Sequence, residues 1–157
     1  MLHEYPLVHI SIAKSPVDFL FLRKLRNEVR QNMTNLTQHL SVWAQLKFYI
    51  FRPSNMEIYI ARFKGRRVAY MLLCDKDGCC FITEAVSEGF RKKNIALTMI
   101  KFAQTIRTSL FADVLVTNLV SQKLHEKAGF SKITQQNNII RYSFNLTDDL
   151  LPPTPIS

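Results

Sequence analysis

Two runs of alternating apolar and polar residues lie next to each other in the middle of the chain, at 57–63 and 67–74. Side chains of a strand alternate between its two faces, so each run predicts a strand with one buried face. Lys64-Gly65-Arg66 separates the runs and has the length and the glycine that favour a hairpin turn. The segment therefore predicts an antiparallel strand pair and limits the fold to architectures that contain a sheet.

The same kind of pattern continues on both sides of this hairpin. Asp75-Lys76-Asp77-Gly78 is typical of a turn, with a glycine that allows positive φ, and it leads into a strand at 79–87. Other short runs alternate or are wholly apolar, and they predict strands at 7–13, 112–117 and 139–146. An additional strand at 131–135 stays an open alternative.

The first predicted helix has a well-marked start. Ser15 can cap it through its hydroxyl, Pro16 suits the first helical position, and Asp18 favours the positive end of the helix dipole. Apolar residues then recur at helical spacing to about residue 30.

Three more helices are predicted downstream. The second starts at Thr37 and has Trp43 on its apolar face. The other two lie at 95–109 and 119–128, and Gly129 closes the last of them.

The order of these elements predicts the fold class. A strand, two helices, three strands, and then helix, strand, helix and strand form a mixed α+β sheet protein. The length of 157 residues suits one domain, which we place at 1–148. Residues 149–157 contain Pro-Pro-Thr-Pro and are expected to be a flexible C-terminal tail.

The charge balance narrows the range of partners. Lys and Arg total 21 against 12 Asp and Glu, which gives a net charge of +9. Such a charge suits nucleic acid or a small phosphorylated ligand. The basic residues are spread along the chain, without a zinc finger, an RNP-like aromatic motif or a basic tail. A nucleic-acid partner is therefore not expected.

The cysteines and the apolar segments indicate the compartment. Cys74, Cys79 and Cys80 form no CxxC pair, so neither a disulfide scaffold nor a metal site is expected. No apolar run approaches the roughly 18 residues of a membrane span, and no signal peptide is visible. We expect a cytoplasmic protein with no membrane partner.

A basic loop lies between a predicted strand and a predicted helix, at 88–96. The free N–H groups at a helix N-terminus and the helix dipole both favour a bound anion. The loop therefore predicts an anion site, with a solvated basic turn as the alternative.

The stretch from Val86 to Ala96 resembles the acetyl-CoA pyrophosphate loop of the GNAT N-acetyltransferases. The family pattern, Arg/Gln-x-x-Gly-x-Gly/Ala, stands here as Arg91-Lys92-Lys93-Asn94-Ile95-Ala96. Asn94 replaces the central glycine, and asparagine is among the few residues that tolerate left-handed backbone angles. We expect the loop to survive with a weaker hold on the cofactor. The resemblance implies that acetyl-CoA contacts Val86, Arg91, Lys92, Lys93, Asn94 and Ala96.

A second stretch, 117–130, resembles the strand-end asparagine, helix and closing Lys-x-Gly-Phe of the same family. It implies that Asn118 and Ser121 also contact acetyl-CoA, with a helix cap and close helix packing as their alternative roles. The resemblance covers about 7–146 and implies the GNAT fold, a largely antiparallel central sheet flanked by helices.

The N-terminal part resembles one GNAT branch, which includes bacterial amino-sugar-nucleotide N-acetyltransferases and ribosomal-protein N-terminal acetyltransferases. The resemblance rests on Arg26-Asn27-Glu28-Val29-Arg30, Met33, His39 and Trp43. It implies that Asn27, Arg30, His39 and Trp43 line the acceptor site. Core packing and a solvated helix face are the alternatives.

The family resemblance also implies direct attack of an amine on the acetyl-CoA thioester. The amine must lose a proton, and Glu84 on the strand 79–87 is the candidate base. His125 stands where the family often has a tyrosine, and it is the candidate acid for the leaving thiolate. An outward-facing Glu84 and an ordinary surface histidine are the alternatives.

The leading hypothesis is acetyl transfer to a primary amine of a small molecule, such as a nucleotide-linked amino sugar. Acetylation of a protein N-terminus is an alternative, and so is a GNAT-fold protein that binds coenzyme A without catalysis. Whether the protein forms a homodimer stays open.

Overall fold

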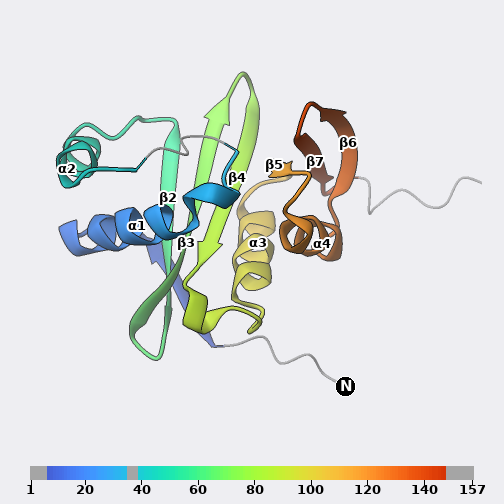
Figure 1. Ribbon diagram of the computed structural model, residues 1–157. Helices are drawn as coiled ribbons and strands as arrows, with labels where there is room; N and C mark the ends of the chain where they lie inside the picture. Colours follow the sequence, from blue (N-terminus) through green and yellow to red (C-terminus); the bar gives the residue numbers. More distant parts are fainter. Residues whose placement is uncertain (1–6, 35–38, 148–157) are drawn as a thin grey trace, which may run out of the picture.

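The computed structural model describes residues 7–34 and 39–147, and its centre is a single seven-stranded sheet (Figure 1). The strand order across the sheet is β1-β2-β3-β4-β5-β7-β6. The strands are β1 (Val8–Ile12), β2 (Met56–Phe63), β3 (Arg66–Lys76), β4 (Cys79–Val86), β5 (Ser109–Leu115), β6 (Ser131–Gln136) and β7 (Ile139–Asn145). The helices are α1 (Pro16–Val29), α2 (Val42–Ile50), α3 (Ile95–Ile106) and α4 (Leu119–Lys127), with short 3-10 turns η1 (Arg30–Asn32) and η2 (Glu88–Phe90).

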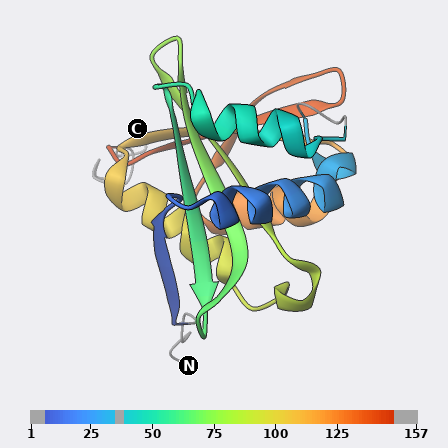
Figure 2. The same ribbon diagram turned by 90° about the vertical axis from the view of Figure 1, so that its left-hand side faces the viewer.

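The helices form two layers, one on each face of the sheet. Helices α1 and α2 lie together on one face, and α3 and α4 lie on the other (Figure 1 and Figure 2). All neighbouring strands are antiparallel except β4 and β5, which are parallel. The predicted mixed, largely antiparallel sheet flanked by helices is therefore confirmed.

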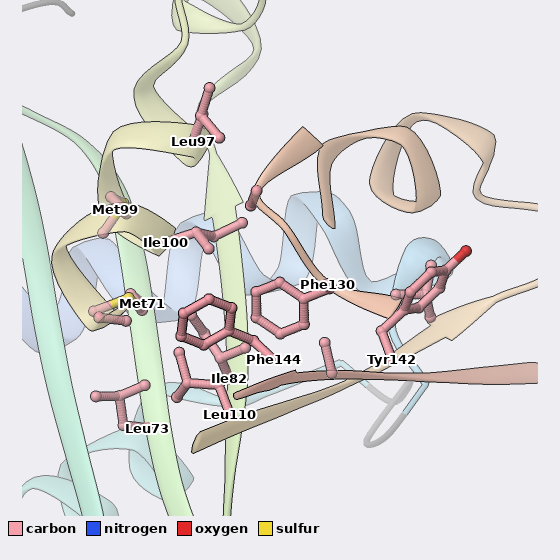
Figure 3. Packing of buried hydrophobic residues seen from close by; sticks show 14 of the residues in the cluster. Met71, Leu73, Ile82, Leu97, Met99, Ile100, Leu110, Phe130, Tyr142 and Phe144 are labelled. Carbon is pink, nitrogen blue, oxygen red and sulfur yellow. The ribbon is translucent and has the colours of Figure 1, made fainter. Parts of the chain in front are cut away.

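Each face of the sheet has its own apolar core. On the α3 side, Met99 and Ile100 pack toward Met71, Ile82 and the aromatic side chains that follow α4 (Figure 3). On the α1 side, the buried cluster joins residues of α1, β2, β3 and the link between β1 and α1: Ala13, Phe19, Leu22, Leu25, Ile58, Ile60 and Tyr70. The sheet thus separates two packed layers, and any ligand that reaches both must pass between strands.

The start of α1 is fastened to the sheet by a buried carboxylate. Ser15 caps the helix, as the sequence indicated, and Asp18 completes a reciprocal capping box that the sequence analysis did not predict. The Asp18 residue is only 3% exposed. Arg62 and Arg67 donate to the Asp18 carboxylate at 2.6 and 2.7 Å. Burial alone would raise the Asp18 pKa, but Arg67, the backbone N–H groups of Lys14 and Ser15, and Arg62 together lower it to about 2.

The second helix differs from the prediction. It begins at Val42 after the capping residue Ser41, while the predicted start, Thr37, lies outside the described residues. Trp43 is 81% exposed, and Gln45 is the buried residue of this helix. The expected apolar face was wrong, because α2 turns Gln45, Phe48 and Tyr49 inward, and the two aromatic side chains pack against Phe19 of α1.

The third helix also ends earlier than predicted. It stops at Ile106, and Arg107 is extended, with its guanidinium 3.0 Å from Glu57 of β2. The next strand consequently begins at Ser109 instead of residue 112. The optional strand near 131–135 is present as β6, and the predicted tail at 149–157 lies outside the described residues.

None of the helices in the described part of the chain is both long enough and apolar enough to span a membrane.

Candidate active site

The sheet opens between its two parallel strands. β4 and β5 are in register only at Phe81 and Phe111, and beyond this point the strands diverge. Ser87 N–H donates to the Val68 carbonyl of β3 at 2.8 Å. Backbone groups alternate in direction along a strand, so the N–H groups of Glu84 and Val86 point away from β3 and into the gap.

A cavity of about 580 Å³ occupies this gap and is lined from both faces of the sheet. Nine of the residues predicted for the site line it: Glu84, Val86, Arg91, Lys92, Asn94, Ala96, Asn118, Ser121 and His125. The α1 side contributes Val29, Asn32, Met33, Thr34 and Tyr70. The opening between β4 and β5 therefore connects the two layers of the fold through one cavity.

The loop at one end of the cavity has the left-handed conformation expected of it. Asn94 has φ 59° and ψ 18°, and Lys92 has φ 60°. Arg91 Nε donates to the Val86 carbonyl at 3.2 Å and so ties the loop to the end of β4. Asn94 makes no side-chain cap to the 12-residue helix α3, so the first N–H groups of that helix are open to an anion.

Glu84 and His125 meet in the centre of the cavity wall. Glu84 Oε1 lies 3.7 Å from His125 Nε2, and the two side chains are 7% and 2% exposed. Glu84 Oε2 and His125 Nε2 are buried without a hydrogen-bond partner among the described residues. Burial raises the Glu84 pKa, and the nearby His125 only partly offsets this.

The other nitrogen of the imidazole is fixed by the helix that carries it. His125 Nδ1 lies 2.8 Å from the Ser121 carbonyl oxygen, which can only accept, so Nδ1 is the protonated nitrogen. The ring is held between Phe130, edge-on at 5.1 Å, and Tyr142, stacked at 6.1 Å. Nε2 is therefore the ring nitrogen that faces Glu84.

Helix α4 is positioned by its first turn. The Asn118 side chain accepts a hydrogen bond from Ser121 N–H at 3.2 Å and so caps the helix. The cap fixes the position of the Ser121 carbonyl, which in turn orients His125. Asn118 therefore has a capping role at the wall of the cavity.

A model of the acetyltransferase (GNAT) family matches residues 22–130, a stretch that includes the gap, the loop and α4. The chain belongs to this family. It is an N-acetyltransferase and uses acetyl-CoA as its co-substrate. A comparison with curated proteins gave no match.

Solved structures, among them two acetyltransferases, share the fold at low sequence identity. Spermidine N-acetyltransferase from Vibrio cholerae, in complex with CoA and spermine, has a TM-score of 0.78 at 13% identity and covers 92% of this chain and 98% of its own. Ribosomal-protein-alanine N-acetyltransferase from Brucella melitensis has a TM-score of 0.70 at 17% identity, covering 88% and 99%. A domain from Methanocaldococcus jannaschii has a TM-score of 0.74 at 19% identity, covering 88% and 98%.

The residues of this acetyltransferase fit a coenzyme A molecule. Left-handed residues at Lys92 and Asn94 curl the loop before α3, and the uncapped helix end offers N–H groups to a pyrophosphate. Arg91 and Lys92 add positive charge at the same end of the cavity. The gap between β4 and β5 exposes strand N–H groups that can pair with an extended ligand.

Five predicted site residues lie outside the cavity lining. Asn27 exchanges hydrogen bonds with the Leu40 backbone at 2.8 and 3.0 Å, so its amide joins α1 to the segment before α2. The other four are Lys93, Arg30, His39 and Trp43. Their predicted contacts with cofactor or acceptor stay predictions.

Sequence reasoning missed the α1 end of the cavity. Tyr70 looked like one more buried residue of an alternating strand, although its hydroxyl distinguishes it from its apolar neighbours. Arg26 lies four residues after Leu22 and three before Val29, so its charged side chain shares the buried face of α1 with these apolar residues. In both cases the sequence shows a polar group at a position that the pattern assigns to the core, and this signal could have pointed to the site.

Proposed function

We propose that this acetyltransferase transfers the acetyl group to a primary amine of a small molecule and that Glu84 and His125 together accept the amine proton. The observation that carries the proposal is their buried contact on the wall of a cavity that crosses the sheet. Two ionisable groups in buried contact, each with an atom that has no hydrogen-bond partner among the described residues, are more typical of a catalytic pair than of a structural one.

Acetyl-CoA supplies a thioester: the amine nitrogen bonds to its carbonyl carbon, the carbon–sulfur bond breaks, and coenzyme A leaves as the thiol. An ammonium group has no lone pair, so the amine must first give up a proton. Glu84 has a raised pKa, which brings its basicity closer to that of an amine. His125 Nε2 lies beside it, so the pair can accept a proton from the nitrogen. The nitrogen loses two protons in going from ammonium to amide: one protonates the leaving sulfur and the other is released to solvent.

The gap also supports a site for the developing negative charge on the carbonyl oxygen. The N–H groups of Glu84 and Val86 point into the gap without a neighbouring strand to accept them. Backbone donors that are fixed before the reaction stabilise an oxyanion effectively. Val86 is the preferred donor because it lies at the end of β4, where the loop begins.

The lining favours an acceptor with one amine. The acidic residues of the lining are Glu84 and Asp113, and Arg141 holds Asp113 at 2.7 and 2.8 Å. No further carboxylate of the described residues lines the cavity to pair with a second cation. A polyamine, as bound by the Vibrio cholerae relative, or a basic peptide therefore fits less well than a small monoamine.

The test is release of coenzyme A thiol from acetyl-CoA in the presence of a panel of amines. The panel contains amino acids, amino-sugar nucleotides, spermidine and a short peptide with a free N-terminus. We expect turnover with a small monoamine, and a loss of roughly 100-fold or more in kcat in Glu84→Gln and His125→Phe. Turnover that survives both substitutions contradicts the proposed roles, and binding of coenzyme A without turnover of any amine contradicts catalysis.

A further inference from the structure

The α1 end of the cavity contains a buried hydroxyl with nothing to bind. Tyr70 is 0% exposed and lines the cavity, and its hydroxyl has no hydrogen-bond partner among the described residues. Buried tyrosine hydroxyls are nearly always paired, because water is lost on burial and must be replaced. The Tyr70 hydroxyl is thus a donor that a ligand in the cavity can satisfy.

Helix α1 contributes a second unpartnered donor. Arg26 Nε is buried and has no hydrogen-bond partner among the described residues. Arg26 is not itself part of the cavity lining, but it shares a helix face with Val29, which lines the cavity, and its charge acts on the Tyr70 hydroxyl. Neighbouring arginines are engaged: Arg23 donates to the Leu40 carbonyl at 3.0 Å, and Arg62 and Arg67 hold Asp18. Arg26 therefore brings a positive charge that no carboxylate in residues 7–34 and 39–147 pairs with.

The cavity connects these donors with the catalytic pair. Tyr70 of β3 is in register with Ala85 of β4, so the side chains of Tyr70 and Glu84 start on opposite faces of the sheet, and both line the cavity that crosses it. Burial raises the Tyr70 pKa to about 12; Arg26 opposes the rise and Glu84 adds to it, as expected for a hydroxyl that senses both charges. The hydroxyl consequently remains protonated and able to donate.

We propose that Arg26 and Tyr70 form a carboxylate-binding subsite, so that the acceptor is an amine with a carboxylate close to its amino group, such as an α-amino acid. The inference rests on the proposed function and specifies its substrate class. A guanidinium supplies only donors and carries a positive charge, and a phenol can donate its hydroxyl hydrogen, so the two complement a carboxylate better than a second amine. Tyr70 and Glu84 line the same cavity, so an acceptor whose carboxylate is bound at this subsite can extend its amine toward Glu84.

The test compares L-amino acids with the matching amino alcohols, which keep the amine and lack the carboxylate. The measured quantity is carboxylate preference, the ratio of kcat/KM for L-leucine to that for L-leucinol, with phosphoethanolamine as the probe for a phosphate. We expect a preference of at least about tenfold, the range of hydrogen bonds to a charged group. Arg26→Gln and Tyr70→Phe should each lower this ratio about tenfold.

Two controls separate recognition from folding. Arg23→Gln changes the same residue type on the same helix and should keep the ratio within about twofold. Tyr70→Phe removes a hydroxyl that makes no bond, so its unfolding midpoint should not fall. Equal use of leucine and leucinol overturns the inference, as does a clear preference for phosphoethanolamine or an unchanged ratio in Tyr70→Phe.

The inference can also be tested if no amine is acetylated, an outcome that contradicts the proposed function itself. Calorimetric titration of L-leucine into protein saturated with coenzyme A then measures the subsite alone. Binding that weakens about tenfold in Arg26→Gln supports the subsite. Absence of binding to the unmodified protein overturns it.

Discussion

The left-handed residue at the start of α3 yields a quantitative prediction for the cofactor loop. Asn94 has φ 59° and ψ 18° and makes no side-chain cap, so its backbone conformation is the feature that its residue type controls. Left-handed angles cost a typical L-residue about 1–2 kcal/mol, while asparagine tolerates them better and glycine adopts them freely. Asn94→Ala should therefore cost about 1 kcal/mol, and Asn94→Gly should cost nothing or relieve strain.

The free-energy cost of Asn94→Ala can appear either in the stability of the protein or in its affinity for coenzyme A. If the alanine variant keeps the loop conformation, its Tm falls by roughly 2–4 °C for a domain of this size. If its loop relaxes, bound coenzyme A must restore the conformation, and about 1 kcal/mol corresponds to a fivefold weaker Kd. The two losses should add up to about 1 kcal/mol. Asn94→Gly should bind coenzyme A as tightly as the unmodified protein or more tightly.

Thermal unfolding and calorimetric titration with coenzyme A measure both quantities on the same variants. Asn137, which has φ 55° in the turn between β6 and β7, is a matched control outside the cavity lining. Asn137→Ala should lose similar stability without any change in Kd. An Asn94→Ala variant with neither loss refutes the conformational reasoning. A much weaker Kd in Asn94→Gly does so too, because it would assign the binding to the amide side chain.

Further predictions concern stability. Asp18→Asn should lower the unfolding free energy measured in urea at neutral pH. The depressed pKa of Asp18 contributes about 2 kcal/mol of stability above pH 3.8, and this contribution is lost as the pH falls toward 2. The difference in unfolding free energy between the variant and the unmodified protein should therefore shrink with acidification. A difference that does not depend on pH contradicts the charge pairing. The folded pKa of Glu84 is raised, so ionisation destabilises the fold as pH rises above 4.5, and Glu84→Gln should gain Tm relative to the unmodified protein from pH 5 to 9; a constant Tm difference speaks against this burial cost. Gly129 has φ 89° and an added Cβ would meet only Phe144 at 4.0 Å, so Gly129→Ala should cost about 1–2 kcal/mol in chemical denaturation through backbone strain alone; an unchanged midpoint contradicts this.

Local patterns were sufficient to predict most of the fold. The alternation at 57–63 and 67–74 and the capping box at Ser15 act within a few residues, and the structure reproduces them. The start of α2 could not be predicted in the same way, because Ser41 caps as readily as Thr37. The segment before α2 is held by Asn27 of α1, whose side-chain amide binds the Leu40 backbone 13 residues further along the chain.

The site was predictable where it depends on neighbours in sequence. The left-handed conformation of Asn94 followed from one loop motif. The contact between Glu84 and His125 depends on where α4 lies against β4, which no local pattern specifies. The acceptor end depends on a strand that contributes Tyr70 to the α1 face, so its polar character emerged only from the tertiary structure.

The central claim, that Glu84 and His125 act as one proton acceptor, is tested most directly by a double-mutant cycle on kcat. The assay follows thiol release with the best amine of the panel for the unmodified enzyme, Glu84→Gln, His125→Phe and the double variant. Residues that act as a unit are strongly non-additive, so the double variant should be about as slow as the slower single variant. Losses that multiply in the double variant, or a single variant with full activity, would contradict the claim.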